Sequence, residues 1–297
     1  MVGKDSSKMK RGADSESLLK TDIKLCWVMA LRSEAIPVID AFDMSIVSNE
    51  LLFPIYVNAK NGHALVISGT GSAKSAAGAT YLKSFLDVKS YAAWINLGIA
   101  GYFKEPTGKL FQALKVENHD SRQAYFPGLR LSKFVDGCAL LTVSKPELDF
   151  PDQVLYDMEA SGFCELAPTF SCNELTYVFK VVSDTPCTKA SLVTKNIVTN
   201  LIENNIETIL KLVETIGELV KVEKNRLVIP QEVNHYMEKF QFTESNRVKF
   251  QQIYKKWRSA FPNKTLNALN YTPISAQELI TRLEQDLLDE VKDWNLV

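Results

Sequence analysis

The sequence is poor in the residues that build metal and redox centres. Its 297 residues include three histidines, at 63, 119 and 235, and five cysteines, at 26, 138, 164, 172 and 187. The histidines are far apart, and no two cysteines form a Cys-x-x-Cys pair. Zinc sites and cysteine redox motifs depend on close spacing of such residues. We therefore expect no metal ion and no cofactor, and cysteines that are buried as free thiols.

Long apolar runs and an excess of one charge are also missing. No apolar stretch approaches the roughly 20 residues of a membrane-spanning helix, and the net charge is -1. The net charge and the apolar runs therefore indicate no overall attraction of the chain to a membrane or to nucleic acid. The first 20 residues are polar and charged, without the apolar segment of a secretory signal. We expect residues 1–21 to form a disordered tail and the protein to be cytoplasmic.

What the chain does contain is an alternation of apolar runs and amphipathic segments. The composition, 46% hydrophobic and 23% charged, is that of an ordinary globular protein. We predict strands at 23–30, 51–57, 63–68, 91–97, 109–116, 138–143 and 177–182, and helices at 34–42, 73–86, 160–167 and 195–220. Such alternation is typical of an α/β fold with a mainly parallel, twisted sheet covered by helices.

The chain becomes more polar after about residue 222, where we predict helices at 231–240, 244–260 and 275–293. We divide the chain into the tail, a domain at 22–221 and a helical extension at 222–297. Trp257 lies within a local basic run formed by Lys255, Lys256 and Arg258. We favour a solvated helix face with Trp257 packed inward. The alternative is a surface for nucleic acid or a protein partner.

Two acidic motifs follow predicted strands. The first strand, near residue 155, ends in Asp157-Met158-Glu159, and the second ends in Ser183-Asp184. Carboxylates at strand ends lie where open α/β sheets bind their ligands. Two of them in one domain would hold a polyhydroxylated ligand and supply a catalytic proton. The alternative is that each carboxylate caps the start of a helix.

Two glycine-containing loops also follow predicted strands. They read Ser68-Gly69-Thr70-Gly71 and Gly98-Ile99-Ala100-Gly101. Backbone N–H groups at a strand-to-helix loop favour an anion or a hydroxyl ligand. Each loop alone is equally consistent with a tight turn, and neither is a Gly-x-Gly-x-x-Gly or a Walker A motif. Together with the two acidic motifs, they indicate a ligand site.

Taken in order along the chain, these motifs carry a family resemblance. The chain resembles the superfamily of purine nucleoside phosphorylases and methylthioadenosine/adenosylhomocysteine nucleosidases over roughly residues 22–220. The matching segments are Val28 to Glu34, Ser68 to Gly71, Asn96 to Gly101, Asp157 to Ala160 and Val182 to Asp184. The resemblance implies a three-layer fold with a twisted, mixed central sheet, and it leaves the helical extension outside the usual core.

The resemblance also implies roles for individual residues. Glu34 matches the glutamate that activates the attacking water, and Asp184 matches the aspartate that protonates the departing purine. Glu159, with Met158, matches the pair that binds the ribose. The further substrate-binding residues are Ser68, Gly71, Gly98, Ala100, Gly101 and Ser183. Such catalysis needs no metal, and we expect burial to raise the pKa of Asp184.

The nucleophile is water in one branch of the superfamily and phosphate in the other. Phosphorylases of the family carry a Gly-Asp-Pro-x-Arg loop, where this chain has Ala30-Leu31-Arg32-Ser33-Glu34. Glu34 would repel phosphate and suits water, whereas Arg32 would be the phosphate ligand of a phosphorylase. We therefore expect a nucleosidase for a purine nucleoside or a 5′-substituted derivative, with a phosphorylase as the alternative.

One segment departs from the family pattern and leaves the substrate open. Residues 142–150 lack the Ser-Gly-Asp-x-Phe motif that contacts the base in similar nucleosidases, so Phe150 or another aromatic residue is left to stack on it. This departure keeps open a non-catalytic nucleoside-binding protein, or a substrate within a nucleotide or nucleic acid that the extension delivers. The segment Tyr125-Phe126-Pro127-Gly128 resembles a family loop that reaches a neighbouring subunit, which implies a homodimer.

Overall fold

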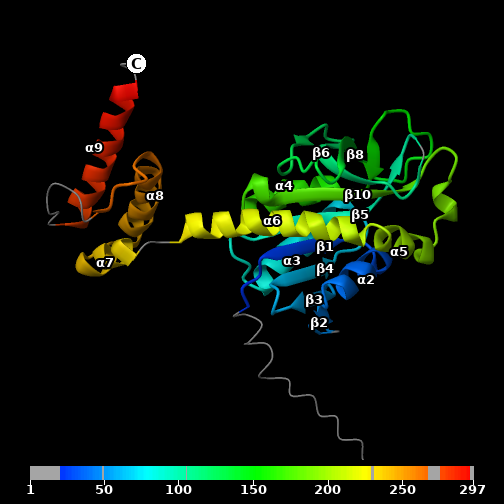
Figure 1. Cartoon of the computed structure of the whole chain (residues 1–297), viewed down its shortest axis with the longest axis horizontal. Helices are drawn as coiled ribbons and strands as arrows, with labels where there is room; N and C mark the ends of the chain where they lie inside the picture. The colour runs from blue at the N-terminus through cyan, green and yellow to red at the C-terminus, as the bar shows by residue number, and fades with distance from the viewer. Residues whose placement is uncertain (1–20, 49, 105, 229–230, 267–274, 295–297) are drawn as a thin grey trace, which may run out of the picture. The chain divides into compact units, whose positions relative to one another are not determined.

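Figure 1 shows the computed structural model, which describes residues 21–48, 50–104, 106–228, 231–266 and 275–294. The predicted disordered tail lies, except for Thr21, outside these residues. The chain divides into two compact units, Met1–Arg226 and Leu227–Val297. The boundary predicted between residues 221 and 222 falls inside a helix, α6 (Ile206–Leu227), and stays a prediction.

A ten-stranded mixed sheet forms the centre of the first unit, in the order β10-β6-β8-β9-β5-β1-β4-β3-β2, with β7 on β6. Because β10 also pairs with β5, the strands β10, β6, β8, β9 and β5 close into a ring. The strands are β1 (Leu25–Met29), β2 (Ser45–Ile46), β3 (Ile55–Asn58), β4 (His63–Ile67), β5 (Ala93–Tyr102), β6 (Leu110–Asn118), β7 (Ala124–Tyr125), β8 (Asp136–Thr142), β9 (Leu155–Asp157) and β10 (Thr176–Asp184).

Helices cover both faces of this sheet, as Figure 1 shows. Successive side chains of a strand point to opposite faces, and β1 is apolar on both. Trp27 and Met29 pack in the core that includes residues of α2 (Arg32–Ala41), α5 (Lys195–Glu203) and α6. Cys26 and Val28 pack in the core that includes residues of α3 (Ser72–Phe85) and α4 (Ala160–Phe170). The predicted three-layer α/β fold with a mixed central sheet is confirmed.

Two of the predicted elements were wrong. The strand expected to end at Leu97 continues to Tyr102, so the glycine loop is part of β5, held there by parallel pairing with β10. The helix expected at 195–220 is two helices, α5 and α6. The Asn205 side chain, which donates hydrogen bonds to the carbonyls of Leu201 and Gly108, marks the break between them.

The second unit consists of α7 (Gln231–Lys239), α8 (Glu244–Ala260) and α9 (Ala276–Trp294), as the sequence predicted. Its core includes Phe250 and Trp257, and the Trp257 indole donates a hydrogen bond to Asp286 at 3.1 Å. The inward packing of Trp257 is therefore confirmed. Its basic neighbours on α8, Lys255, Lys256 and Arg258, are exposed. Within the described ranges, no helix combines the length and the apolar character needed to span a bilayer.

A close approach of α4 to α3 predicts that one glycine, Gly162, is sensitive to substitution. A Cβ atom added at Gly162 would lie 2.1 Å from the carbonyl oxygen of Ser72, whereas one added at Gly217, within α6, would meet nothing within 4 Å. We expect Gly162→Ala to lower the free energy of unfolding by about 1–3 kcal/mol, the usual cost of overpacking. Gly217→Ala is the matched control and should raise it by up to about 1 kcal/mol. Urea unfolding followed by circular dichroism measures both, and equal effects would contradict this packing.

Candidate active site

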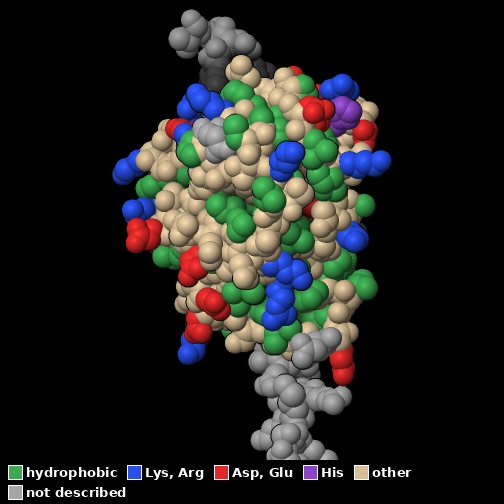
Figure 2. All heavy atoms as spheres, turned by 90° about the vertical axis from the view of Figure 1, so that its right-hand side faces the viewer, with side chains coloured by type: hydrophobic (Ala, Val, Ile, Leu, Met, Phe, Trp, Pro, Cys, Tyr) green, Lys and Arg blue, Asp and Glu red, His purple; other side chains and the backbone are tan. Residues whose placement is uncertain are grey.

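A cavity of about 290 Å³ lies where β1 meets α2 and where β5, β9 and β10 come together. Seven of the predicted site residues line it: Glu34, Ala100, Gly101, Met158, Glu159, Ser183 and Asp184. The rim includes Lys195 at the start of α5 and Glu147 in the loop after β8. Figure 2 looks onto the side of the first unit that carries α5, where apolar and basic side chains are mixed. The structure thus brings together the three predicted catalytic and ribose-binding carboxylates.

Four predicted residues do not line the cavity. Gly71 and Gly98 act through the carboxylates, as described below. The Ser68 hydroxyl is buried and donates a hydrogen bond to the carbonyl of Gly69 at 3.0 Å, so it belongs to the loop itself. Arg32 is the exposed first residue of α2 and lies outside the cavity wall.

Glu34 is held in the cavity wall by two backbone groups. Its side chain is only 3% exposed, and its carboxylate accepts hydrogen bonds from the N–H of Ile99 and the N–H of Leu31, each at 2.9 Å. Gly98 makes room for it, because a Cβ atom there would lie 2.8 Å from the carboxylate oxygen Oε1. Burial raises the pKa of Glu34, and the Lys180 ammonium and the backbone donors oppose that shift.

Glu159 precedes α4 but does not cap it. Its carboxylate turns across to the loop before α3 and accepts a hydrogen bond from the N–H of Gly71 at 2.9 Å. Burial and the nearby Asp157 carboxylate raise its pKa to about 7, while the Lys180 ammonium partly offsets them. At neutral pH the charged and protonated forms of Glu159 are therefore comparable in amount.

Asp184 ends β10 and is followed by a loop rather than a helix, since the next helical turn is the short 3-10 helix η2 (Ala190–Leu192). It is therefore not a helix cap, the alternative left open by its sequence. Burial raises its pKa, and a hydrogen bond donated by the Ser183 hydroxyl opposes the shift. This upward shift in the pKa of Asp184 is the shift predicted for a proton donor.

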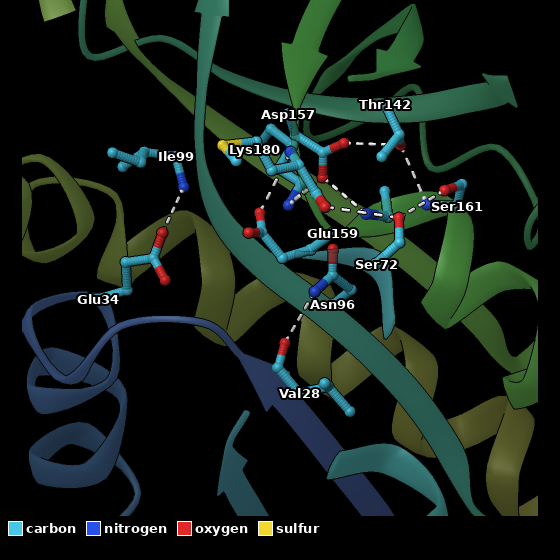
Figure 3. Close-up of polar contacts among 12 residues, drawn as sticks. Val28, Glu34, Ser72, Asn96, Ile99, Thr142, Asp157, Glu159, Ser161 and Lys180 are labelled. Atoms are coloured by element: carbon cyan, nitrogen blue, oxygen red, sulfur yellow. Dashed lines mark hydrogen bonds and ion pairs between the residues drawn. The ribbon is translucent and has the colours of Figure 1, made fainter. Parts of the chain in front are cut away.

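The capping role belongs instead to Asp157, which sequence reasoning left without a function. It accepts a hydrogen bond from the N–H of Ala160 at 2.8 Å and one from the Thr142 hydroxyl at 2.7 Å. It also forms an ion pair of 2.8 Å with Lys180, drawn in Figure 3. Lys180 is 1% exposed. Its signal in the sequence was a lysine inside a continuous apolar strand, and that signal was missed.

The proposed stacking residue lies behind the cavity. Phe150 is buried and packs edge-on against Tyr156, with ring centroids 5.7 Å apart, and Tyr156 rather than Phe150 lines the cavity. Phe150 also lies against Gly101, where a Cβ atom would be 2.6 Å from its ring. Among the described residues, no group of three or more histidine, cysteine or acidic side chains is arranged to hold a metal ion.

Comparison with known proteins bears on the fold. No protein-family model and no curated protein matches the chain. Solved structures do match it, and the chain shares its fold with structures of nucleosidases and of a futalosine hydrolase. The resemblance drawn from the sequence motifs is confirmed at this level.

The individual matches are of similar quality. The structure of Arabidopsis thaliana 5′-methylthioadenosine nucleosidase in its apo form is 17% identical, with a TM-score of 0.55 over 66% of this chain and 97% of that one. Helicobacter pylori 5′-methylthioadenosine/S-adenosylhomocysteine nucleosidase with butyl-thio-DADMe-Immucillin-A is 13% identical, with a TM-score of 0.55 over 65% and 98%. Futalosine hydrolase of the same organism gives the same identity, TM-score and coverage.

The raised pKa of Glu159 predicts a pH-dependent cost in stability. Its pKa rises from 4.5 to about 7 on folding, so the folded state binds the proton more tightly and the free energy of unfolding falls as pH rises through this window. We expect Glu159→Gln to be more stable than wild type by about 3 kcal/mol at pH 8, with the difference vanishing below about pH 4.5. Urea unfolding of both proteins across this range measures it.

The matched control is Glu214→Gln, because Glu214 is exposed on α6. It should differ from wild type by the same small amount at every pH. A difference for Glu159→Gln that does not change with pH would contradict the raised pKa.

Proposed function

We propose that the chain is a nucleosidase that hydrolyses the N-glycosidic bond of a purine nucleoside or a 5′-substituted derivative. The observation that carries the proposal is the convergence of Glu34, Glu159 and Asp184 on one cavity from three different elements. The fold supports it, because the chain shares its fold with nucleosidases and a futalosine hydrolase.

Asp184 suits the task of the acid. Cleavage of an N-glycosidic bond expels a purine, which leaves readily only when it is protonated. Since burial raises the pKa of Asp184, more of this carboxyl is protonated near neutral pH than an exposed aspartate would be. A positioned acid of this kind typically contributes a factor of about 10² to 10⁴ in rate.

Glu159 and Glu34 suit the two remaining tasks. As the bond to the base breaks, the sugar acquires oxocarbenium character, and a carboxylate beside it stabilises that positive charge. Glu159, next to Met158 in the cavity wall, would accept hydrogen bonds from the ribose hydroxyls. Glu34 would accept a proton from the attacking water, and its raised pKa makes it a stronger base than an exposed glutamate.

A phosphorylase fits this cavity less well. A phosphate ion needs cationic and N–H donors, yet Lys195 at the rim is the one cation among the described lining residues. Arg32, the phosphate ligand expected for a phosphorylase, is exposed and outside the wall. A non-catalytic nucleoside-binding protein is also less favoured, because burying Glu34 and Glu159 is costly and binding alone does not need a proton donor.

Release of free base from a panel of purine nucleosides, 5′-substituted nucleosides and nucleotides tests the proposal. We expect release in buffer without phosphate, and its loss in Glu34→Gln. Arg32→Gln should keep the activity. Release that requires phosphate, and that disappears in Arg32→Gln, would establish a phosphorylase instead. Binding without release from any compound would leave a non-catalytic protein.

The acid assignment makes a separate prediction. Asp184→Asn cannot donate the proton but keeps the size and hydrogen-bonding capacity of the side chain, so we expect kcat to fall by about 10²-fold or more with KM within about threefold. Steady-state kinetics measure both constants. Asp40→Asn, at an exposed position of α2, is the control and should match wild type. An unchanged kcat in Asp184→Asn would remove Asp184 from the mechanism.

The homodimer implied by the segment 125–128 belongs to the same proposal. In this segment Phe126 is 63% exposed and is therefore accessible for a contact with a second subunit.

A further inference from the structure

The wall of the cavity contains more buried acid than buried base. Glu34, Asp157 and Glu159 are 3%, 5% and 7% exposed, and the buried Lys180 is the cation that acts on all three. If every group were ionised, three negative charges would face one positive charge. Burial alone lowers the pKa of Lys180, but attraction to Asp157, Glu159 and Glu34 raises it overall, so the lysine is charged.

The sheet register places Lys180 on the same face as the carboxylate of Glu34. Lys180 on β10 is the direct partner of Gly98 on β5, and partnered residues project to the same face of a sheet. A Cβ atom at Gly98 would lie 2.8 Å from the Glu34 carboxylate. Glu34 and Lys180 therefore lie on the same face of β5. Gly98 has no side chain, so the strand leaves space on that face for the Glu34 carboxylate. In Figure 3, Glu34 extends into the site from α2, and Glu159 lies across the site from Glu34.

Asp157 fixes the lysine rather than joining the reaction. One of its carboxylate oxygens accepts from the Thr142 hydroxyl, and the other accepts from the N–H of Ala160 and contacts the Lys180 ammonium at 2.8 Å. With both oxygens occupied, Asp157 is committed to holding the ammonium in place. The pair supplies little stability of its own, because a buried ion pair is often no better than apolar residues of the same volume.

We propose that Lys180, held by Asp157, is a positioning residue that increases the charged fraction of Glu34 and Glu159 near neutral pH. This inference rests on the proposed function, since it gives both carboxylates the charge that their roles require. Water activation needs a Glu34 that is free to accept a proton. Binding of the oxocarbenium-like sugar needs a negative Glu159. Without the lysine, burial would raise the pKa of both groups further.

The charges around each group are few. The Lys180 ammonium faces Glu34, and Asp157, Lys180 and Glu34 face Glu159. Asp184 is affected by burial and by the Ser183 hydroxyl. Lys180 is therefore the cation shared by Glu34 and Glu159, and its removal should act on these two groups while leaving the acid Asp184 unchanged.

The pH profile of kcat/KM tests the inference. Glu34 must be ionised to act, so activity is lost below its pKa and Glu34 contributes the acidic limb. An opposite charge nearby lowers a carboxyl pKa by about 1 to 3 units. We expect Lys180→Met to move the acidic limb to higher pH by about one unit or more, with the alkaline limb unchanged. A lysine with a purely structural role would lower kcat/KM by one factor at every pH, and an unmoved limb would overturn the proposal.

Three further variants separate charge from packing. Lys180→Arg keeps the charge and should keep the limb within about half a pH unit, because the charge rather than the side-chain shape sets it. Asp157→Asn keeps the lysine and should leave the limb in place or move it to lower pH. The double variant Asp157→Asn with Lys180→Met removes the pair without leaving a buried unpaired charge, and should shift the limb upward as Lys180→Met does. It replaces the single variant if that variant does not fold. A limb that moves as far upward in Lys180→Arg as in Lys180→Met would overturn the proposal.

A second measurement does not depend on catalysis. The carboxyl resonances of ¹³C-labelled glutamate, assigned with Glu34→Gln and Glu159→Gln, report the pKa of each group directly. We expect both values to rise in Lys180→Met. If they rise and no compound is hydrolysed, the electrostatic inference holds and the proposed function fails. If compounds are hydrolysed and neither value moves, the function holds and the inference fails.

Discussion

The burial of carboxylates around one lysine is the constraint on which the site depends. Glu34 and Glu159 lie in the wall of a cavity, where burial opposes their charge, and Lys180 restores part of it. Removing a charge from water costs several kcal/mol unless partners are supplied. The site therefore has to provide both a cation and oriented hydrogen-bond donors. Much of the local structure serves to position these groups.

The donors come from the backbone, which is why loops and glycines matter here. Two N–H groups hold Glu34, and the N–H of Gly71 reaches Glu159 from the loop before α3. Gly98 leaves open the position on β5 that Glu34 and Lys180 flank. The ring of strands closed by the pairing of β10 with β5 joins the strand that carries Lys180 to the strand beside Glu34. Backbone donors and strand register thus place charges that no single sequence motif would bring together.

Local patterns in the sequence were sufficient for most of the fold. Apolar runs and amphipathic segments are short-range signals, and they located most of the elements. The errors arose where tertiary contacts decide the outcome. The glycines after Leu97 indicate a turn in isolation, but pairing with β10 keeps them in a strand. The apolar period at 195–220 continues through a break that Asn205 marks by bonding to Gly108, 97 residues away.

In the candidate site too, local patterns revealed some residues, and tertiary contacts decided the others. Glu159 and Asp184 were found because they follow or end strands, and Glu34 because it matches a family motif. Lys180 was not found, because nothing local states which acid a buried lysine faces. Phe150 was a stacking candidate because of its place in the segment 142–150, whereas in the fold it packs against Tyr156. The side chains that contact the base, and hence the substrate, are the part of the site for which the sequence holds least information.

In the proposed function, three carboxylates act on one nucleoside, each in a different role. The crystal structure of Glu34→Gln with an uncleaved purine nucleoside tests it most directly, because this variant should bind the substrate without hydrolysing it. We expect the ribose hydroxyls to donate to Glu159, the base to lie against Asp184, and the anomeric carbon to face residue 34. A nucleoside bound outside this cavity, or one turned so that the base lies on Glu159, would contradict it.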